Sequence, residues 1–288
     1  MEMQSEGRIH FTKMTGSGND FIIIDNRGGA IDADNCRDLV SRACRRKLSV
    51  GADGLILIEN DPEVDFKWRF FNADGGEAEM CGNGARCAAR FAHLQGIVSK
   101  PFMAFRTLAG IIEAEIREEK VKIRVTEPHS QELDLCLDAE GQTHCLHFIN
   151  TGVPHVVIFQ DKAAGLESAD VFHLGRTFRH HPRFQPAGSN VNFAFVQDPH
   201  HVSVRTYERG VEDETLACGT GSIATALLAS AKGLASSPVH VATRSGETLT
   251  IHFEAFSNQG AMQFRKIYLE GDAKVVYVAE LWDETLRQ

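Results

Sequence analysis

One eight-residue pattern occurs twice in this chain and constrains its fold more than any other feature. Residues 77–84 and 214–221 both read Glu-x-x-x-Cys-Gly-x-Gly, and their cysteines, Cys81 and Cys218, are 137 residues apart. Matches in the same order at nearly one offset predict two structurally similar halves. The alternative is that Gly-rich turns resemble each other by chance, but chance would not be expected to give nearly the same offset each time. Two more pairs of segments recur at an offset of 136, namely 107–110 with 243–246 and 18–21 with 154–157.

Length and charge agree with two domains and exclude some functions. The chain has 288 residues, 43% of them hydrophobic and 24% charged, which is typical of a globular protein of about two domains. A net charge of −9 argues against a general nucleic-acid binder. The longest apolar runs, such as 21–24 and 55–58, are too short to span a membrane. The polar residues 1–10 contain no apolar signal-peptide core, so we expect a cytoplasmic protein.

Short apolar segments alternate with few helical ones, which predicts an α+β fold rather than a βαβ repeat. Helices are expected at 34–46, 84–94 and 221–232, the last two directly after the cysteine motifs. The expected strands are 21–25, 55–59, 66–72, 110–116, 121–125, 145–149, 155–159, 190–196, 202–207, 239–243, 248–254 and 275–281.

Cys81 and Cys218 each stand at a predicted loop-to-helix junction. Backbone N–H groups are unpaired at the start of a helix, and the helix dipole there favours negative charge. We therefore expect a lowered thiol pKa at both positions and a place for a carboxylate beside each. Asn83 and Thr220 occupy the same place in the two copies and could cap a helix.

Two such cysteines suit one particular kind of chemistry. If the halves face each other across a pseudo-twofold axis, one thiolate can remove a proton from a carbon and one thiol can return a proton to its opposite face. Fixed N–H donors would stabilise the charge that develops on a neighbouring carboxylate.

These motifs, with others along nearly the whole chain, resemble the diaminopimelate epimerase family. The two cysteine motifs, residues 79–86 and 215–221, are the specific part of the resemblance. The flanking matches are Lys13-Met14-x-Gly16-x-Gly18-Asn19-Asp20-Phe21, Gly51-Ala52-Asp53-Gly54, Phe71-Asn72-Ala73-Asp74-Gly75, Gly152-Val153-Pro154-His155, Asn190-Val191-Asn192-Phe193 and Glu208-Arg209-Gly210.

The resemblance implies two similar domains, each an antiparallel sheet wrapped around a central helix. We expect them at 1–126 with 273–288 and at 127–272. It implies interconversion of LL- and meso-diaminopimelate without a cofactor or metal, on the path to lysine and peptidoglycan. The expected partner is a small amino-acid substrate, with no nucleic acid or membrane. Family members are often dimeric, so we expect a homodimer.

The resemblance also implies roles for single residues. Cys81 and Cys218 are the expected catalytic pair, and His155 and Glu208 are expected to orient or tune them. Gly82, Asn83, Gly219 and Thr220 are expected to hold the reacting carboxylate. The expected polar pocket consists of Asn19, Asn72, Asn190, Glu208 and Arg209, where the last two have the charges that suit the distal ammonium and carboxylate of the substrate.

The chain departs from the family pattern at three positions near this pocket. Thr15 stands where the family often has His, and Gly54 where some members have a substrate-contacting Gln. Val153 replaces an Asn before the Pro-His pair, so a polar contact to the distal group is missing there or is supplied by water.

Other candidate residues have simpler interpretations. A free cysteine is most often a small buried hydrophobe, which is our expectation for Cys36, Cys44, Cys87, Cys136 and Cys145. The pairs 180–181 and 200–201 are His-His but lack metal-ligand spacing, so we place them in surface loops. Residues 219–224 resemble half of a dinucleotide fingerprint but follow a polar stretch rather than a buried strand.

Three other functions remain open. A racemase of proline or hydroxyproline would keep the fold and change the substrate, although Glu208 and Arg209 favour a substrate with a second charged end. A thiol redox protein would join Cys81 to Cys218 reversibly. A carboxylate-binding module would not need both thiols.

Overall fold

The computed structural model describes residues 8–258 and 260–286, which form two compact units. Among the described residues, the first unit contains 8–123 and 271–286, and the second contains 124–258 and 260–270. The boundaries predicted from the sequence, after residues 126 and 272, lie close to these.

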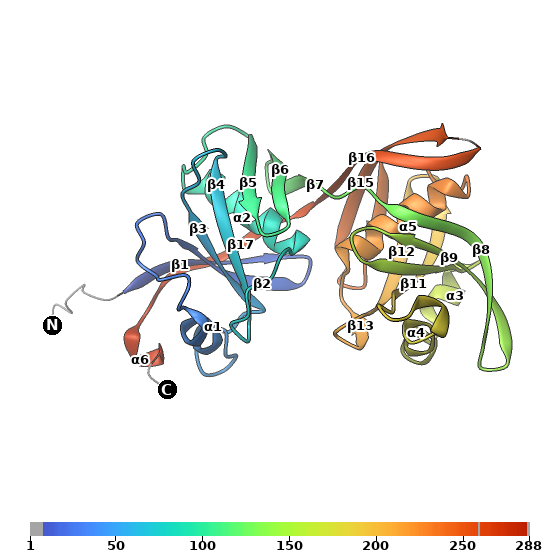
Figure 1. The fold of residues 1–288 in the computed structure, drawn as a ribbon, viewed down its shortest axis with the longest axis horizontal. Coiled ribbons are helices and arrows are strands. Elements are labelled where there is room, and N and C mark those ends of the chain that lie inside the picture. Colours follow the sequence, from blue (N-terminus) through green and yellow to red (C-terminus); the bar gives the residue numbers. More distant parts are fainter. Residues whose placement is uncertain (1–7, 259, 287–288) are drawn as a thin grey trace. The chain divides into compact units, whose positions relative to one another are not determined.

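The elements of each unit follow one another in a matching order (Figure 1). The first unit has β1 (Ile9–Gly16), β2 (Asn19–Asp25), α1 (Arg37–Ala43), β3 (Gly54–Glu59), β4 (Phe66–Asn72), α2 (Gly82–Leu94), β5 (Phe102–Thr107), β6 (Gly110–Arg117), β7 (Lys120–Arg124), β17 (Lys274–Leu281) and α6 (Asp283–Leu286). The second has β8 (His129–Ala139), β9 (Gln142–Asn150), β10 (Pro154–Phe159), α3 (Ala163–Glu167), α4 (Val171–Arg179), a 3-10 turn at Pro182–Phe184, β11 (Asn190–Asp198), β12 (His201–Glu208), β13 (Asp213–Thr215), α5 (Gly219–Ala231), β14 (Val239–Ala242), β15 (Thr248–Asn258) and β16 (Ala261–Asp272).

The strand pairings confirm that the two units are built on one plan. In the first unit the paired strands are β17–β1, β1–β2, β2–β3, β3–β4, β4–β5, β5–β6 and β6–β7. In the second they are β8–β9, β9–β10, β10–β11, β11–β12, β12–β14, β14–β15 and β15–β16. Each pairing has the same direction in both lists, and α2 and α5 take equivalent places.

The sheets contain both parallel and antiparallel pairs, whereas the family resemblance led us to expect antiparallel sheets. The pairs β2–β3 and β4–β5 are parallel, as are their counterparts β10–β11 and β12–β14. Parallel neighbours need a crossover connection, usually a helix. Here α1, α2, the α3–α4 segment and α5 provide these crossovers. The predicted α+β class holds, but each unit contains two strand–helix–strand crossovers.

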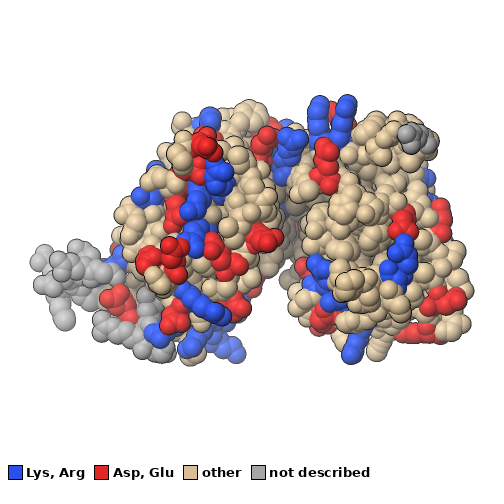
Figure 2. Space-filling model, in the orientation of Figure 1, with Lys and Arg blue, Asp and Glu red and all other residues tan. Residues whose placement is uncertain are grey.

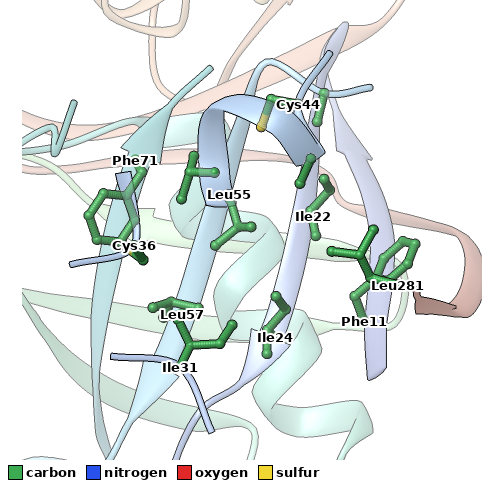
Figure 3. Close-up of a cluster of buried hydrophobic side chains, with 13 residues drawn as sticks. Phe11, Ile22, Ile24, Ile31, Cys36, Cys44, Leu55, Leu57, Phe71 and Leu281 are labelled. Atoms are coloured by element: carbon green, nitrogen blue, oxygen red, sulfur yellow. The ribbon is translucent and has the colours of Figure 1, made fainter. Parts of the chain in front are cut away.

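Helices cover both faces of the first unit's sheet, and this explains its continuous apolar strands. Ile22 and Ile24 of β2 lie beside Leu55 and Leu57 of β3, on the face covered by the connection that contains α1 (Figure 3). The alternate residues face α2, because a Cβ on Gly84 would lie 3.3 Å from Ile56 and 3.5 Å from Phe21. The α2 N-terminus is thereby fixed on a rigid surface.

The second unit has the same layers. Val156, Val191 and Tyr207 pack with Leu166 of α3 and Phe178 of α4 in one buried cluster. Helix α5 packs against strands β9, β10, β11, β12, β14 and β15, and its residues 221–230 are buried.

Every strand expected from the sequence is present, but several others were not predicted. The unpredicted strands are β1, β5, β8, β13 and β16, and the unpredicted helices are α3, α4 and α6. Helix α1 covers only Arg37–Ala43 of the expected 34–46.

Acidic and basic side chains are intermixed on the face of each unit that Figure 2 shows. Many form ion pairs, such as Arg69 with Glu77 at 2.8 Å and Arg106 with Asp61 at 2.7 Å. Within the described ranges, no helix combines the length and the hydropathy required for a bilayer span.

Candidate functional site

Cys81 is the N-cap residue of α2. Its backbone is extended, with φ −146° and ψ 115°, and its Sγ accepts a hydrogen bond from Gly84 N at 3.5 Å. The side chain is partly exposed. The thiol therefore stands where the amides of the first helical turn meet solvent.

Asn83 and Arg86 hold that first turn in place. Asn83 is buried, and its amide nitrogen donates to Asn19 Oδ1 at 2.7 Å. The fully buried Arg86 donates to Asn83 Oδ1 at 2.9 Å and to Ser17 Oγ at 2.8 Å. The structure thus brings together three predicted site residues, Cys81, Asn83 and Asn19.

A cluster of charges supports Asn19 from the other side. Asn19 donates to Asp53 Oδ2 at 3.0 Å, and Arg46 contacts both Asp53 and Asp20. Lys13 is buried, with its Nζ 2.8 Å from Asp20 Oδ2. Burial alone would raise the pKa of Asp20, but the hydrogen bonds from Arg46 and Lys13 lower it to about 2.

Cys218 is the equivalent N-cap residue of α5, with φ −125° and ψ 111°. Its Sγ lies 3.5 Å from Thr220 Oγ1, and only 6% of the residue is exposed. Thr151 Oγ1 donates to the Thr220 carbonyl at 3.1 Å, which ties the end of β9 to the first turn of α5.

The expected low pKa at Cys218 is wrong for the structure described. Burial, followed by the charge of Glu208, raises the pKa of Cys218 from 9 to about 12. That change disfavours the thiolate by about 4 kcal/mol, whereas a helix terminus contributes about 0.3–2 kcal/mol. Desolvation outweighs the helix dipole here, so Cys218 is protonated at neutral pH.

His155 lies at the start of β10, beside Asn192, which the first turn of α5 approaches closely. It is fully buried, and its Nδ1 is 3.1 Å from Asn192 Nδ2. Its Nε2 has no hydrogen-bond partner within residues 8–258 and 260–286. Burial, assisted by the charge of Arg209, lowers the pKa of His155 to about 3, so the imidazole is neutral.

Asn192 connects this histidine to the cysteine's helix. It is fully buried, and its Oδ1 accepts from Thr206 Oγ1 at 2.9 Å. A Cβ on Gly221 would lie 2.3 Å from the same Oδ1 and 3.3 Å from Cys218 Sγ. Only glycine permits α5 to approach Asn192 this closely.

Asn190 begins β11, and Glu208 and Arg209 lie at the end of its antiparallel neighbour β12. Buried Asn190 donates to the Pro154 carbonyl at 3.1 Å and accepts from Arg209 N at 2.8 Å. Arg209 Nη1 donates to the Ala187 carbonyl at 3.0 Å. Burial raises the pKa of Glu208. These side chains belong to the same end of the second unit as His155 and Cys218.

Asn72 is placed less tightly than the other predicted residues. It is exposed at the end of β4, opposite Gly54 in the register, and its backbone closes the turn to Gly76. A Cβ on Gly54 would lie 2.6 Å from the Phe71 carbonyl, which is a structural reason for glycine at this departure from the family pattern. At Thr15, another departure, the hydroxyl donates to the Asn19 carbonyl at 3.0 Å.

Several contributors to the site received no role from the sequence, namely Arg86, Asp53, Arg46, Thr151 and Asn192. Asn192 had a usable signal, because residues two apart in a strand point to the same face and Asn190 was already a candidate.

Two cysteines expected in the core lie on the surface instead. Cys36, Cys44 and Cys87 are buried as predicted, but Cys136 and Cys145 are exposed on β8 and β9. Both lie on the outer face of the β8–β9 hairpin, whose other face packs Leu135, Leu137 and Leu146 on the buried cluster. Of the two His-His pairs, His180, His200 and His201 are exposed and His181 is half-buried, but His201 begins β12 instead of lying in a loop.

The comparisons with known proteins decide the family. The family model of diaminopimelate epimerase matches residues 11–130 and 147–276. The curated diaminopimelate epimerase of Aquifex aeolicus is 46% identical over 96% of this chain and 99% of its own length. This chain belongs to the diaminopimelate epimerase family. Members of the family are isomerases that act on an amino acid.

Solved structures show how widely the fold is shared. A PhzF-family phenazine biosynthesis protein of Bacillus anthracis matches with a TM-score of 0.73 at 16% identity, over 97% of this chain and 100% of that one. A hydroxyproline epimerase of Agrobacterium vitis matches with a TM-score of 0.66 at 15% identity, over 97% and 94%. At these identities the likeness concerns the fold alone.

Proposed function

We propose that this diaminopimelate epimerase family member interconverts LL- and meso-diaminopimelate through a two-base reaction of Cys81 and Cys218. The observation that carries the proposal is the equivalence of the two cysteines. Each caps the helix that occupies the same place in its unit, ahead of a Gly-x-Gly first turn. A pair of acid–base groups related in this way suits a reaction whose two directions are chemically alike.

The environments of the two thiols suggest how the reaction starts. The raised pKa of Cys218 makes it the proton donor. Cys81 is partly exposed and accepts an amide hydrogen bond, so we assign it as the thiolate base. Cys81 takes the α-proton of the LL centre, and Cys218 delivers its own proton to the opposite face of that carbon. Afterwards Cys81 is the thiol and Cys218 the thiolate, which is the state that takes meso-diaminopimelate in the reverse direction.

The first helical turns supply the groups that stabilise the carbanion. We assign the reacting carboxylate to the amides of Gly82 and Asn83 in α2 and of Gly219 and Thr220 in α5. Amides at a helix start are oriented before the substrate arrives, so they stabilise developing charge without reorganisation. A Cβ on Gly219 would lie only 3.1 Å from the side chain of Leu269 in β16. Glycine at this position therefore lets the first turn of α5 lie close to that strand.

The distal half of the substrate carries an ammonium and a carboxylate. We assign the carboxylate to Arg209, whose planar fork can donate two parallel hydrogen bonds. Asn19, Asn72 and Asn190 provide polar contacts to the remaining groups. Glu208 has the charge to attract the ammonium, and through its effect on the pKa of Cys218 it also tunes the acid.

His155 is assigned a supporting role beside Cys218. Because Nδ1 accepts from Asn192 Nδ2, the neutral imidazole carries its hydrogen on Nε2, which can donate a hydrogen bond without bringing a competing charge. Asn192 fixes the ring through Nδ1.

Two wider features belong to the same proposal. The reaction needs reduced thiols, which cytoplasmic conditions maintain, so we place the enzyme in the cytoplasm. We propose a homodimer that uses β17, where Val276 is 54% and Val278 66% exposed. An exposed apolar strand of this kind is typical of a subunit interface.

A comparison of substrates tests the function. Reduced enzyme is incubated separately with LL-diaminopimelate, L-proline and trans-4-hydroxy-L-proline, and chiral chromatography follows each product. We expect the meso form from the first and no isomer from the other two, because Glu208 and Arg209 would face a substrate lacking the second charged end. Turnover of proline but not diaminopimelate would assign the chain to the alternative racemase activity.

A further inference from the structure

The hairpin of β8 and β9 carries two cysteines that the proposed reaction does not use. Cys136 and Cys145 are both exposed, are partners in the strand register, and have their Sγ atoms 3.2 Å apart. They belong to the second unit and occupy its surface, whereas Cys218 is buried in the same unit.

The turn of this hairpin determines the geometry of the pair. Glu140 and Gly141 form a two-residue loop with φ of 53° and 78°, the signs that a type I′ turn requires. Such a turn is closed by a hydrogen-bonded pair, here Ala139 with Gln142, and pairs then alternate along the ladder. By this alternation Cys136 and Cys145 form a non-hydrogen-bonded pair.

That position suits a covalent bridge. Cα atoms of a non-hydrogen-bonded pair are about 4.5 Å apart, and disulfides join Cα atoms about 4.4–6.8 Å apart. Asp138 and Thr143 are the neighbouring non-hydrogen-bonded pair. Their side chains already meet across the strands, where Thr143 Oγ1 donates a hydrogen bond to Asp138 Oδ1 at 2.6 Å. The sulfurs can reach bonding distance by rotation of their side chains, without a change of register.

The hairpin also presents the pair to solvent in a fixed position. Leu135 and Leu137 on the opposite face of β8 pack against the buried cluster of the second unit, together with Leu146 of β9. The outer face is thereby left to Cys136 and Cys145, where a small oxidant can reach them.

We infer that Cys136 and Cys145 are a modification site, at which a low-molecular-weight disulfide oxidises the two thiols to a reversible cross-strand disulfide. One protein thiolate attacks the small disulfide, forms a mixed disulfide and releases one small thiol. The second protein thiolate attacks the protein sulfur of that mixed disulfide and releases the other. Two protein S–H bonds are lost, one S–S bond forms in the protein, and the two protons and two electrons leave with the two small thiols.

Mass spectrometry of the intact, folded enzyme tests this site. The protein is treated with glutathione disulfide, alkylated and cleaved by a Glu-specific protease, which cuts after Glu140 and so separates the two cysteines. We expect peptides 133–140 and 141–167 to be joined, with a mass about 2 Da below their sum, and to separate after dithiothreitol. Stable glutathione adducts on separate peptides, or two thiols that both remain alkylatable, would overturn the proposal.

Single and double variants give the matched controls. In Cys136→Ser the glutathione adduct on Cys145 should persist, because the resolving thiol is gone. In Cys136→Ser/Cys145→Ser, epimerisation should stay within about twofold of wild type, since surface changes away from the site are usually mild. Oxidation should raise the unfolding midpoint of the wild type but not of the double variant. Equal changes in both proteins would place the effect at other cysteines.

Discussion

At the scale of single residues, the two copies of the cysteine motif are alike in sequence but differ in their surroundings. Cys81 is partly exposed, whereas Cys218 is buried. The third residue of each helix is glycine, yet Gly84 meets side-chain ends and Gly221 meets the fixed amide of Asn192. The two copies of the motif have the same backbone conformation. The residues of the neighbouring strands make the surroundings of the two thiols different.

The paired glycines offer a test of this difference. In Gly221→Ala the new Cβ would lie 2.3 Å from Asn192 Oδ1, so either Asn192 or the first turn of α5 must move. We expect kcat/KM to fall by at least about 100-fold, as for a catalytic group misplaced by about 1 Å. Gly84→Ala is the matched control. Its Cβ would meet Ile56 at 3.3 Å, and we expect a loss below about tenfold. Equal effects at both positions would show that Asn192 has no part in positioning Cys218.

The buried His155 predicts how stability depends on pH. Its folded pKa of about 3 lies below the ordinary 6.5, so between these values the unfolded chain binds a proton that the folded protein does not. Stability from this residue is complete above pH 6.5 and is lost as the pH falls, by about 1.4 kcal/mol per pH unit. Urea unfolding at several pH values between about 4.5 and 6 measures this dependence. The plot of unfolding free energy against pH should have a shallower slope for His155→Asn than for wild type.

The exposed His173→Asn serves as the control for that measurement. It should leave the slope unchanged. If His155→Asn and wild type have the same slope, the histidine is not held neutral by burial.

At the scale of elements, the first turn of α2 depends on one buried cation. Arg86 donates to Asn83 and Ser17, and its Nη1 lies 3.5 Å from the Gly82 carbonyl. A single side chain therefore fixes two of the residues assigned to the substrate carboxylate.

Arg86→Lys should separate positioning from charge. Lysine keeps the charge but cannot reproduce the planar fork, so we expect a loss of about 1–3 kcal/mol in unfolding free energy. We also expect kcat to fall more than KM rises, because the amides of Gly82 and Asn83 act on charge that develops during the reaction. Arg90→Lys, one turn along α2 and bonded to Ala273, is the control and should spare kcat. An effect on stability without an effect on kcat would leave Arg86 a structural role only.

Much of each element could be predicted from sequence, and the failures have physical causes. Runs such as Phe21–Ile24 and Leu55–Ile58 are apolar because helices cover both faces of their strands, so they were easily recognised. Strand β8 begins with the polar residues 129–132 and only then alternates Leu133, Leu135 and Leu137 with other residues, and it was missed together with its exposed Cys136. The cysteines of the site and the glycines that follow them repeat in the sequence. The pKa of Cys218 depends on burial and on the charge of Glu208, which the sequence does not show.

At the scale of the whole molecule, the matching strand pairings show that the chain repeats one unit. The sequence offset of 137 between the cysteines is the same offset that separates Gly82 and Gly219, the first residues of α2 and α5. β17 and β8 hold equivalent places in their units. Their exposed faces differ, however, because β17 exposes valines and tyrosine where β8 exposes mainly polar residues.

That contrast makes β17 the proposed subunit contact, and a single charge should disrupt it. Val278→Lys places an ammonium in the apolar patch, and we expect the protein to elute as a monomer where wild type is a dimer. Light scattering after gel filtration measures the mass. Leu108→Lys changes a residue that is 63% exposed, comparable to Val278 at 66%, and should leave the dimer intact. A wild-type monomer, or a dimer that survives Val278→Lys, would contradict this interface.

The central claim is that one thiol from each unit acts on the same α-carbon, and isotope transfer in D₂O tests it most directly. Reduced enzyme is incubated with LL-diaminopimelate, and NMR with chiral chromatography follows both isomers at low conversion. We predict deuterium in the meso product but not in recovered LL substrate, because the abstracted proton stays on Cys81 while Cys218 delivers deuterium. Cys81→Ala and Cys218→Ala should each form no meso product. Deuterium in both isomers from the start, or full turnover by either variant, would contradict the two-thiol account.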